Sequence, residues 1–234
     1  MSTTNFFNFT FLPKYFSLFV QGIEYTLFIS VVSVLLAVVP ALVLALMRLS
    51  KSRMIRCISG MYIAIFRSTP LLVQLALVYF GLFNLIKIPT FYIFGFINTS
   101  MFIPGVVALA LNSAAYVAEI FRAGILAVDS GQNEAARSLG LSASKSMSLV
   151  VLPQAIKNIL PALANEVITM VKESSICSTL GMVELMWAAK TVSATTYITI
   201  GPYVLVAIIY FCINYPASKV IEAIERRMRR GDKR

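Results

Sequence analysis

The stretch from residue 25 to residue 47, YTLFISVVSVLLAVVPALVLALM, contains no charged side chain. An α-helix needs about 20 mainly apolar residues to cross the hydrocarbon core of a bilayer. The backbone amides of such a segment must find hydrogen-bond partners without water, so only a helix or a closed barrel is stable there. Because the stretch lacks two-residue alternation, we predict a membrane-spanning helix, with Pro40 as the site of a kink.

The composition indicates a chain that is embedded in lipid over most of its length. Of 234 residues, 59% are hydrophobic and 13% are charged, against roughly 45–50% apolar and about 25% charged residues in soluble domains. We predict an all-α membrane protein with one transmembrane domain over residues 1–234 and five transmembrane helices. The predicted spans cover residues 25–47, 57–86, 101–121, 158–181 and 195–218.

The second predicted span contains a proline close to an arginine, which leaves its boundaries open. A helix that begins near Cys57 places Arg67 and Pro70 close to the midplane of the bilayer. A helix that begins after Pro70 leaves the preceding residues at the membrane interface. The apolar segment MYIAIF, residues 61–66, favours the first arrangement.

Lysine and arginine are concentrated beside the apolar segments, in a chain with a formal net charge of +10. This placement is typical of membrane proteins, whose cytoplasmic loops are enriched in basic residues, and it argues against a nucleic-acid partner. The basic segments are residues 48–56, 122–157 and 219–234. All of them face the cytoplasm if the N-terminus lies outside and the C-terminus inside, so we predict this topology.

The cytoplasmic loop between the third and fourth spans, residues 129–152, carries strong helix-boundary signals. Asp129 or Ser130 is a favourable cap for the start of a short helix, and Gly140 for its end. Ser142 then caps a second helix. We therefore predict two short helices joined at a glycine corner.

This loop resembles the EAA loop of importer-type ABC transporter permeases. The match consists of EAA at 134–136, Gly140, and LP at 152–153. In that family the loop forms coupling helices, which insert into a groove on the cytoplasmic ATPase subunit. The resemblance implies the following ATPase-coupling residues: Glu134, Ala135, Ala136, Gly140, Leu141 and Ser142.

Further stretches are similar to the polar amino-acid uptake branch of these permeases, the histidine, glutamine, arginine and cystine type. They are FRSTPLLVQ (66–74), AYVAEIFRAGI (115–125) and VKESS (171–175). Ser68 stands where glycine is usual in the branch, and Glu173 where aspartate is commoner. The resemblance extends from about residue 20 to 225 and implies the type I ABC importer transmembrane-domain fold.

The resemblance also implies the partners and the location of the chain. We expect a multi-pass protein of the bacterial inner membrane that pairs with a second permease chain, as a homodimer or a heterodimer. The other expected partners are a cytoplasmic ABC ATPase dimer, which holds ATP and Mg, and an extracytoplasmic amino-acid-binding protein. No cofactor is expected on this chain. Which amino acid it carries is left open by the sequence.

Ionisable and polar side chains within the predicted spans are candidates for substrate contact, because such groups usually face the bundle interior or a wet cavity. Lys172 is a candidate partner for the carboxylate of an amino acid, and Glu173 or Glu119 for its ammonium group. Structural ion pairs are the alternative, with Glu119 paired to Arg122 three residues later. The full candidate set is Arg67, Gln74, Asn112, Glu119, Glu166, Lys172, Glu173 and Ser174.

Other functional classes fit the sequence less well. An ion channel or an ion-coupled secondary transporter for small charged solutes accounts for the intramembrane charges but not for the EAA-like loop. An enzyme is disfavoured because there is no histidine, and GLSASKS, residues 140–146, lacks the second glycine of a phosphate-binding loop. The cysteines stand singly, so no metal site is expected.

Overall fold

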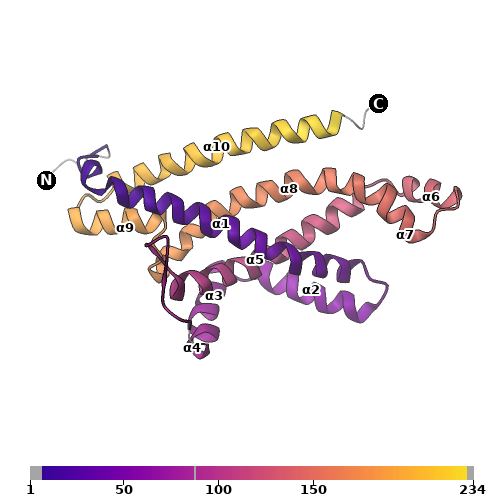
Figure 1. The fold of residues 1–234 in the computed structure, drawn as a ribbon, viewed down its shortest axis with the longest axis horizontal. Coiled ribbons are helices and arrows are strands. Elements are labelled where there is room, and N and C mark those ends of the chain that lie inside the picture. The colour runs from indigo at the N-terminus through magenta and orange to yellow at the C-terminus, as the bar shows by residue number, and fades with distance from the viewer. Residues whose placement is uncertain (1–6, 87, 231–234) are drawn as a thin grey trace.

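The computed structural model describes residues 7–86 and 88–230, which form an elongated bundle of helices (Figure 1). The long helices are α1 (Leu12–Leu49), α5 (Thr99–Leu126), α8 (Leu152–Glu173) and α10 (Gly201–Arg230). The shorter elements are α2 (Arg53–Ser68), α3 (Leu71–Ala76), the π-helix η1 (Leu77–Leu82), α4 (Phe83–Leu85), β1 (Tyr92–Ile93), β2 (Ile97–Asn98), α6 (Ser130–Ser138), α7 (Ala143–Ser146), the π-helix η2 (Met147–Val151), the 3₁₀-helix η3 (Ser174–Leu180) and α9 (Leu185–Thr196).

The membrane-spanning segments agree with the all-α prediction. By length and composition, the described residues contain 4 helices that can cross a bilayer, or up to 5 if the bent pair α2 and α3–α4 counts as one span. Their boundaries differ from the prediction at most ends, and α1 begins at Leu12 rather than near residue 25. Helix α9, between the last two spans, was not predicted.

The second span is not a continuous helix over residues 57–86. Helix α2 ends at Ser68, Pro70 caps the next helix, and the two segments are bent by 105°. A proline disfavours helical geometry in the residue before it and lacks a backbone N–H. The chain therefore turns at Thr69, and Arg67 lies in the last turn of α2, beside the break.

The core lies where α1 packs along α5, which is the most extensive helix–helix contact among the described residues. Small side chains recur every four residues on both helices. Small side chains let two helix backbones approach closely in a membrane, where packing rather than hydrophobicity drives association. The buried alanines that share this cluster are Ala37, Ala41 and Ala45 on α1, and Ala110, Ala114 and Ala118 on α5.

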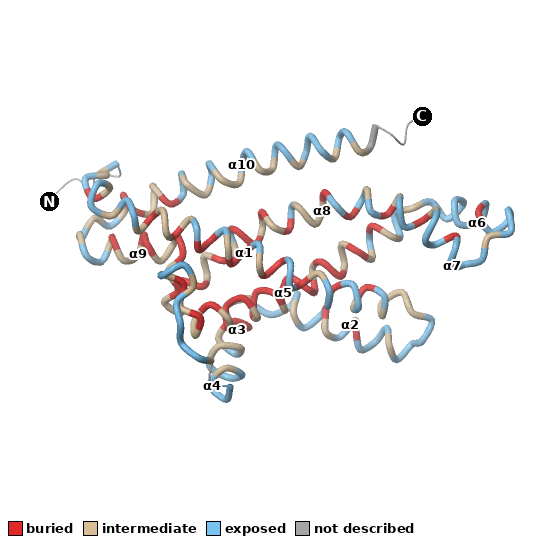
Figure 2. The backbone as a smooth tube through the Cα atoms, viewed as in Figure 1, coloured by how far each residue is buried: buried red, intermediate tan, exposed pale blue. Residues whose placement is uncertain are grey.

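The two ends of the bundle differ in character. The N-terminal end of α1 and α9 lie together at one end, whereas α6 and α7 project beyond the bundle at the other (Figure 1). Helix α10 packs on α8 and α9 and is largely exposed along its length, as the pale blue and tan tube shows (Figure 2). Its exposed apolar side chains, such as Phe211 and Ile208, are available to lipid or to another membrane protein.

Candidate functional site

The projecting loop is built as its local sequence signals predict. The Asp129 side chain caps α6 by accepting a hydrogen bond from the Gly131 amide at 2.7 Å. Ser142 caps α7 by accepting one from the Lys145 amide at 3.3 Å. Gly140 lies between the helices with φ +85°, in the left-handed region that favours glycine.

The corner at Gly140 is a Schellman motif, which is a rigid way to end a helix. The amide of Gly140 donates to the Arg137 carbonyl at 3.0 Å, and that of Leu141 donates to the Ala136 carbonyl at 3.2 Å. These are the paired bonds of the motif. A side-chain bond from Ser146 to Asn133, 2.7 Å long, ties the second helix to the first. The two helices therefore form one module.

The residues of this module differ in how far they are buried. Ala136 is buried, whereas Ala135 and Glu134 are exposed. Leu139, next to the glycine corner, is 85% exposed. This leucine presents apolar surface beside the corner, and no sequence motif predicts it. Its exposure depends on the corner geometry rather than on residue type.

The break in the second span is held by two of the candidate residues. The Gln74 amide nitrogen donates to the carbonyls of Phe66, at 2.8 Å, and Thr69, at 3.0 Å. Its amide oxygen accepts from Asn112 on α5, at 2.8 Å. Backbone groups freed by a break within the membrane must be satisfied by neighbouring side chains. Gln74 and Asn112 do this for the bend between α2 and α3.

Two further candidates have clear positions, one on α8 and one directly after it. Glu166 is buried and accepts a hydrogen bond from Ser113 on α5 at 2.9 Å, which ties these helices together. Ser174 is buried at the start of η3, and its hydroxyl donates to the Val171 carbonyl at 2.9 Å. Beside it, Glu173 is half-buried and Lys172 is exposed.

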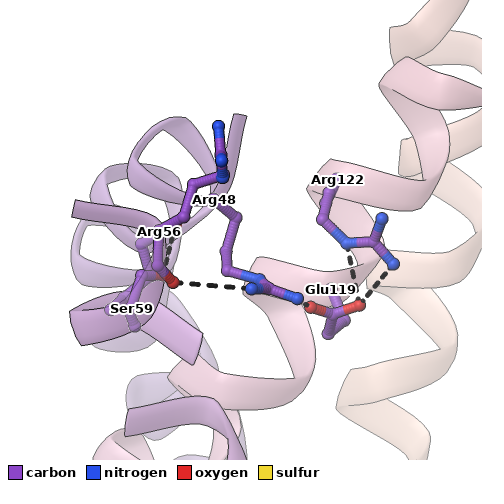
Figure 3. Close-up of polar contacts among 6 residues, drawn as sticks. Arg48, Arg56, Ser59, Glu119 and Arg122 are labelled. Carbon is purple, nitrogen blue, oxygen red and sulfur yellow. Dashed lines mark hydrogen bonds and ion pairs between the residues drawn. The ribbon is translucent and has the colours of Figure 1, made fainter. Parts of the chain in front are cut away.

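Glu119 is the centre of a charged cluster near the end of α5 (Figure 3). One carboxylate oxygen accepts from two nitrogens of Arg122, at 2.8 and 3.0 Å, which is the predicted ion pair. The other oxygen lies 4.0 Å from Nε of Arg48, at the end of α1. Arg48 was expected only to mark the cytoplasmic end of the first span. It also joins α1 to α5.

A polar cavity of about 490 Å³ opens beside this cluster. Its wall combines side chains of α1, α2 and α5. The guanidinium of Arg67 lies over the ring of Tyr116, 5.4 Å from its centroid. The lining residues are Arg48, Gly60, Ile63, Ala64, Arg67, Ser68, Tyr116 and Glu119. The structure thus brings Arg67 and Glu119 of the candidate set together, while Lys172, Glu173 and Ser174 lie outside this lining.

Glu184 is fully buried outside the spanning segments. Its carboxylate caps α9 by accepting from the amides of Met186 and Trp187, each at 2.7 Å, and it lies 3.3 Å from the Tyr210 hydroxyl of α10. Burial raises the pKa of Glu184 to about 7. Glutamate is not a favoured capping residue, so its sequence position carried no signal.

Comparison with known proteins identifies the architecture. The family model described as "binding-protein-dependent transport system inner membrane component" matches residues 20–230. The chain belongs to this family. The putative glutamine transport system permease protein GlnP of Rickettsia conorii is 41% identical over 93% of this chain and 95% of its own length. The arginine transport system permease ArtQ of Bacillus subtilis is 42% identical over 91% and 93% of the two chains.

A solved structure supports the same conclusion. The crystal structure of an amino acid ABC transporter with histidines contains a chain that is 45% identical to this permease. The two superpose with a TM-score of 0.85, over 97% of this chain and all of the other. The fold is therefore the predicted type I importer fold.

Family membership decides between the functional classes. The permease is an inner-membrane component that works with a binding protein and with an ATPase. It is a transport subunit rather than an enzyme, and ATP hydrolysis belongs to a separate subunit. The channel and the ion-coupled secondary transporter are not supported.

Proposed function

We propose that this permease forms the translocation pathway of an ATP-driven importer for amino acids. Its relatives are named for glutamine and arginine transport, and the solved structure that it resembles is of an amino acid ABC transporter. The further partners are a second permease chain, an ABC ATPase dimer that binds ATP and Mg, and an extracytoplasmic amino-acid-binding protein. The pathway runs through a pair of permeases, each contributing one bundle.

The observation that carries the coupling role is the α6–α7 module. Its helices are joined by a Schellman corner, braced by Ser146, and project beyond the bundle with Leu139 exposed at the tip. A rigid projection with an apolar tip transmits the motion of a bound partner to the helices on either side of it. We assign ATPase docking to this module, with the tip around Leu139 and Gly140 in contact with the partner.

The candidate substrate residues fall into two groups, according to whether the side chain already has a hydrogen-bond partner within the bundle. Gln74, Asn112 and Glu166 hold the broken span and the α5–α8 contact in this conformation. Lys172 and Glu173 are adjacent and oppositely charged, at the point where α8 becomes 3₁₀-helical. Neither side chain forms a hydrogen bond or an ion pair with the residues in the ranges 7–86 and 88–230. An amino acid carries a carboxylate and an ammonium group, so we assign its binding in the pathway to these two residues.

The test replaces Gly140 with valine in the permease reconstituted with its ATPase and its binding protein. A β-branched residue is strained at φ +85°, so the module distorts, the ATPase co-purifies less, and ATP-driven uptake of labelled glutamine and arginine falls. Gly95→Val is the matched control, because Gly95 has φ +78° and lies in the β1–β2 hairpin, away from the loop. Normal ATPase association and uptake in Gly140→Val would contradict the docking role.

A further inference from the structure

The cavity between α1, α2 and α5 contains more positive than negative charge. Arg48 and Arg67 line it together with one carboxylate, Glu119, whose Oε2 already accepts from Arg122. Arg67 contacts the Tyr116 ring and forms no ion pair with any residue in the ranges 7–86 and 88–230. Unpaired charge within a span is costly unless it faces a wet path. The cavity is therefore set up to receive an anionic group.

The two arginines occupy different depths. A Cβ atom built on Gly60 would lie 2.9 Å from Nη1 of Arg48, so this guanidinium rests on α2 at the level of Gly60. Arg67 is two helical turns further along α2, about 10 Å deeper at 1.5 Å per residue. Arg48 lies toward the cytoplasmic end of α1, and Arg67 lies beside the helix break. The cavity thus has an inner and an outer guanidinium.

The two arginines differ in how far their donors are already used. Nη1 of Arg48 donates to the Arg56 carbonyl at 3.4 Å, and its buried Nε lies 4.0 Å from Oε1 of Glu119. The Arg67 guanidinium contacts the Tyr116 ring and donates no hydrogen bond to the residues in the ranges 7–86 and 88–230.

The remaining wall is formed by Gly60, Ile63 and Ala64, which have no polar side-chain group, and by Ser68 and Tyr116, which carry hydroxyl groups. The charged groups of the wall favour a ligand that carries charges of its own. The volume of about 490 Å³ lies within the usual range for small-molecule sites.

We propose that this cavity is an exit site that binds the α-carboxylate of the transported amino acid, first at Arg67 and then at Arg48, while the ammonium group faces Oε1 of Glu119. The proposal rests on the proposed function. It assigns the site to the backbone groups that all α-amino acids share, so it does not select the side chain. The phosphate of an anionic lipid has similar chemistry, but Glu119 in the wall favours a zwitterion over a phosphate.

The experiment measures ATP-driven uptake of labelled glutamine and arginine by the full transporter in vesicles of phosphatidylcholine. Arg67→Gln and Arg48→Gln are each expected to lower uptake about tenfold, the loss of one charge-assisted hydrogen bond, and Arg67→Lys to retain more of it. Arg53→Gln, on the exposed start of α2 outside the cavity, is the matched control. Co-purification of the ATPase shows that each variant is assembled.

A binding measurement tests the contribution of the α-carboxylate to affinity. The assembled transporter, without its binding protein, is titrated with L-glutamine and with L-glutaminamide, which lacks the α-carboxylate. We expect glutamine to bind more tightly than the amide, and Arg67→Gln to reduce the difference, with the remainder due to Lys172 in the proposed pathway. Equal binding of the two compounds, or unchanged uptake in both glutamine variants, would overturn the exit site.

The lipid alternative is tested by repeating uptake in vesicles that also contain phosphatidylglycerol. A defect of Arg67→Gln that is present without phosphatidylglycerol supports the substrate role, whereas a defect that requires this lipid assigns the cavity to a headgroup and overturns the proposal. The proposed function is judged separately. It fails if the unaltered transporter shows no ATP-driven amino-acid uptake, whatever the arginine variants do.

Discussion

Glu119 shows how one side chain takes on a role that depends on its neighbours. The i,i+3 pair with Arg122 is local and follows from sequence spacing, and the structure confirms it. The approach of Arg48 from α1 is not local, because it depends on how α1 packs along α5. Two guanidinium groups around one carboxylate leave a net positive charge at this end of the bundle. This charge can attract an anionic ligand only because a cavity adjoins it.

Glu184 leads to a prediction about pH. Its pKa in the folded protein, about 7, is above the ordinary value of 4.5, so the folded state binds the proton more tightly than the unfolded state does. The free energy of unfolding therefore decreases by about 3 kcal/mol as pH rises from 4.5 to about 7, and it levels off above that pH. Thermal unfolding in detergent between pH 5 and 8 measures this decrease.

Glu184→Gln removes the titrating group and is expected to flatten that pH dependence. The matched control is Glu24→Gln, which changes an exposed carboxylate on α1 and leaves the dependence in place. An unfolding midpoint that still falls by the same amount in Glu184→Gln would show that another group titrates. The cap on α9 itself is weakened in this variant, because the carboxylate uses both oxygens for backbone amides.

The elements whose ends are set by residues close in the sequence could be predicted. The elements whose ends depend on contacts with other helices could not. The α6–α7 corner follows from Asp129, Gly140 and Ser142, whose capping preferences act within one or two turns. The 105° bend after Ser68 depends also on Gln74 of α3 and on Asn112, which reaches it from α5. Helix α9 is capped by Glu184, and the start of this helix depends on distant residues. The Leu185 amide donates to Thr26 of α1, and the Tyr210 hydroxyl of α10 donates to Glu184.

The bend leads to a prediction about the second span. Gln74→Leu removes the donor to the Phe66 and Thr69 carbonyls and the acceptor for Asn112, which keeps only a longer bond of 3.4 Å to the Phe66 carbonyl. Each buried polar group left unsatisfied costs about 1–3 kcal/mol, so the thermal unfolding midpoint should fall clearly. Gln21→Leu on α1 is the control, because the described residues show no hydrogen bond from its side chain. Equal midpoints for the two variants would show that water or another group replaces Gln74.

At the scale of the whole molecule, the α6–α7 module is connected to the bundle through the ends of α5 and α8, which pack closely at Gly124. A Cβ at this position would collide with Ile159 of α8, and the Ala155 carbonyl lies 3.5 Å away. A module that moves as a unit can move both helices only while this contact holds. Gly124→Ala should therefore separate them and lower the amount of amino acid taken up per ATP hydrolysed.

The contact can be tested by enlarging the side chain on one helix and shortening the one that faces it on the other. Adding Ile159→Ala to Gly124→Ala makes room for the new methyl group, and the double variant should recover coupling that each single change loses, since contacting residues are not additive. Gly81→Ala is the control, because a Cβ there meets no atom within 4 Å. Uptake and ATP hydrolysis are measured on the same vesicles. If the double variant lost as much coupling as the two single variants together, the motion of the α6–α7 module would reach the bundle through another contact. The candidate would then be the Ser113–Glu166 hydrogen bond between the same helices.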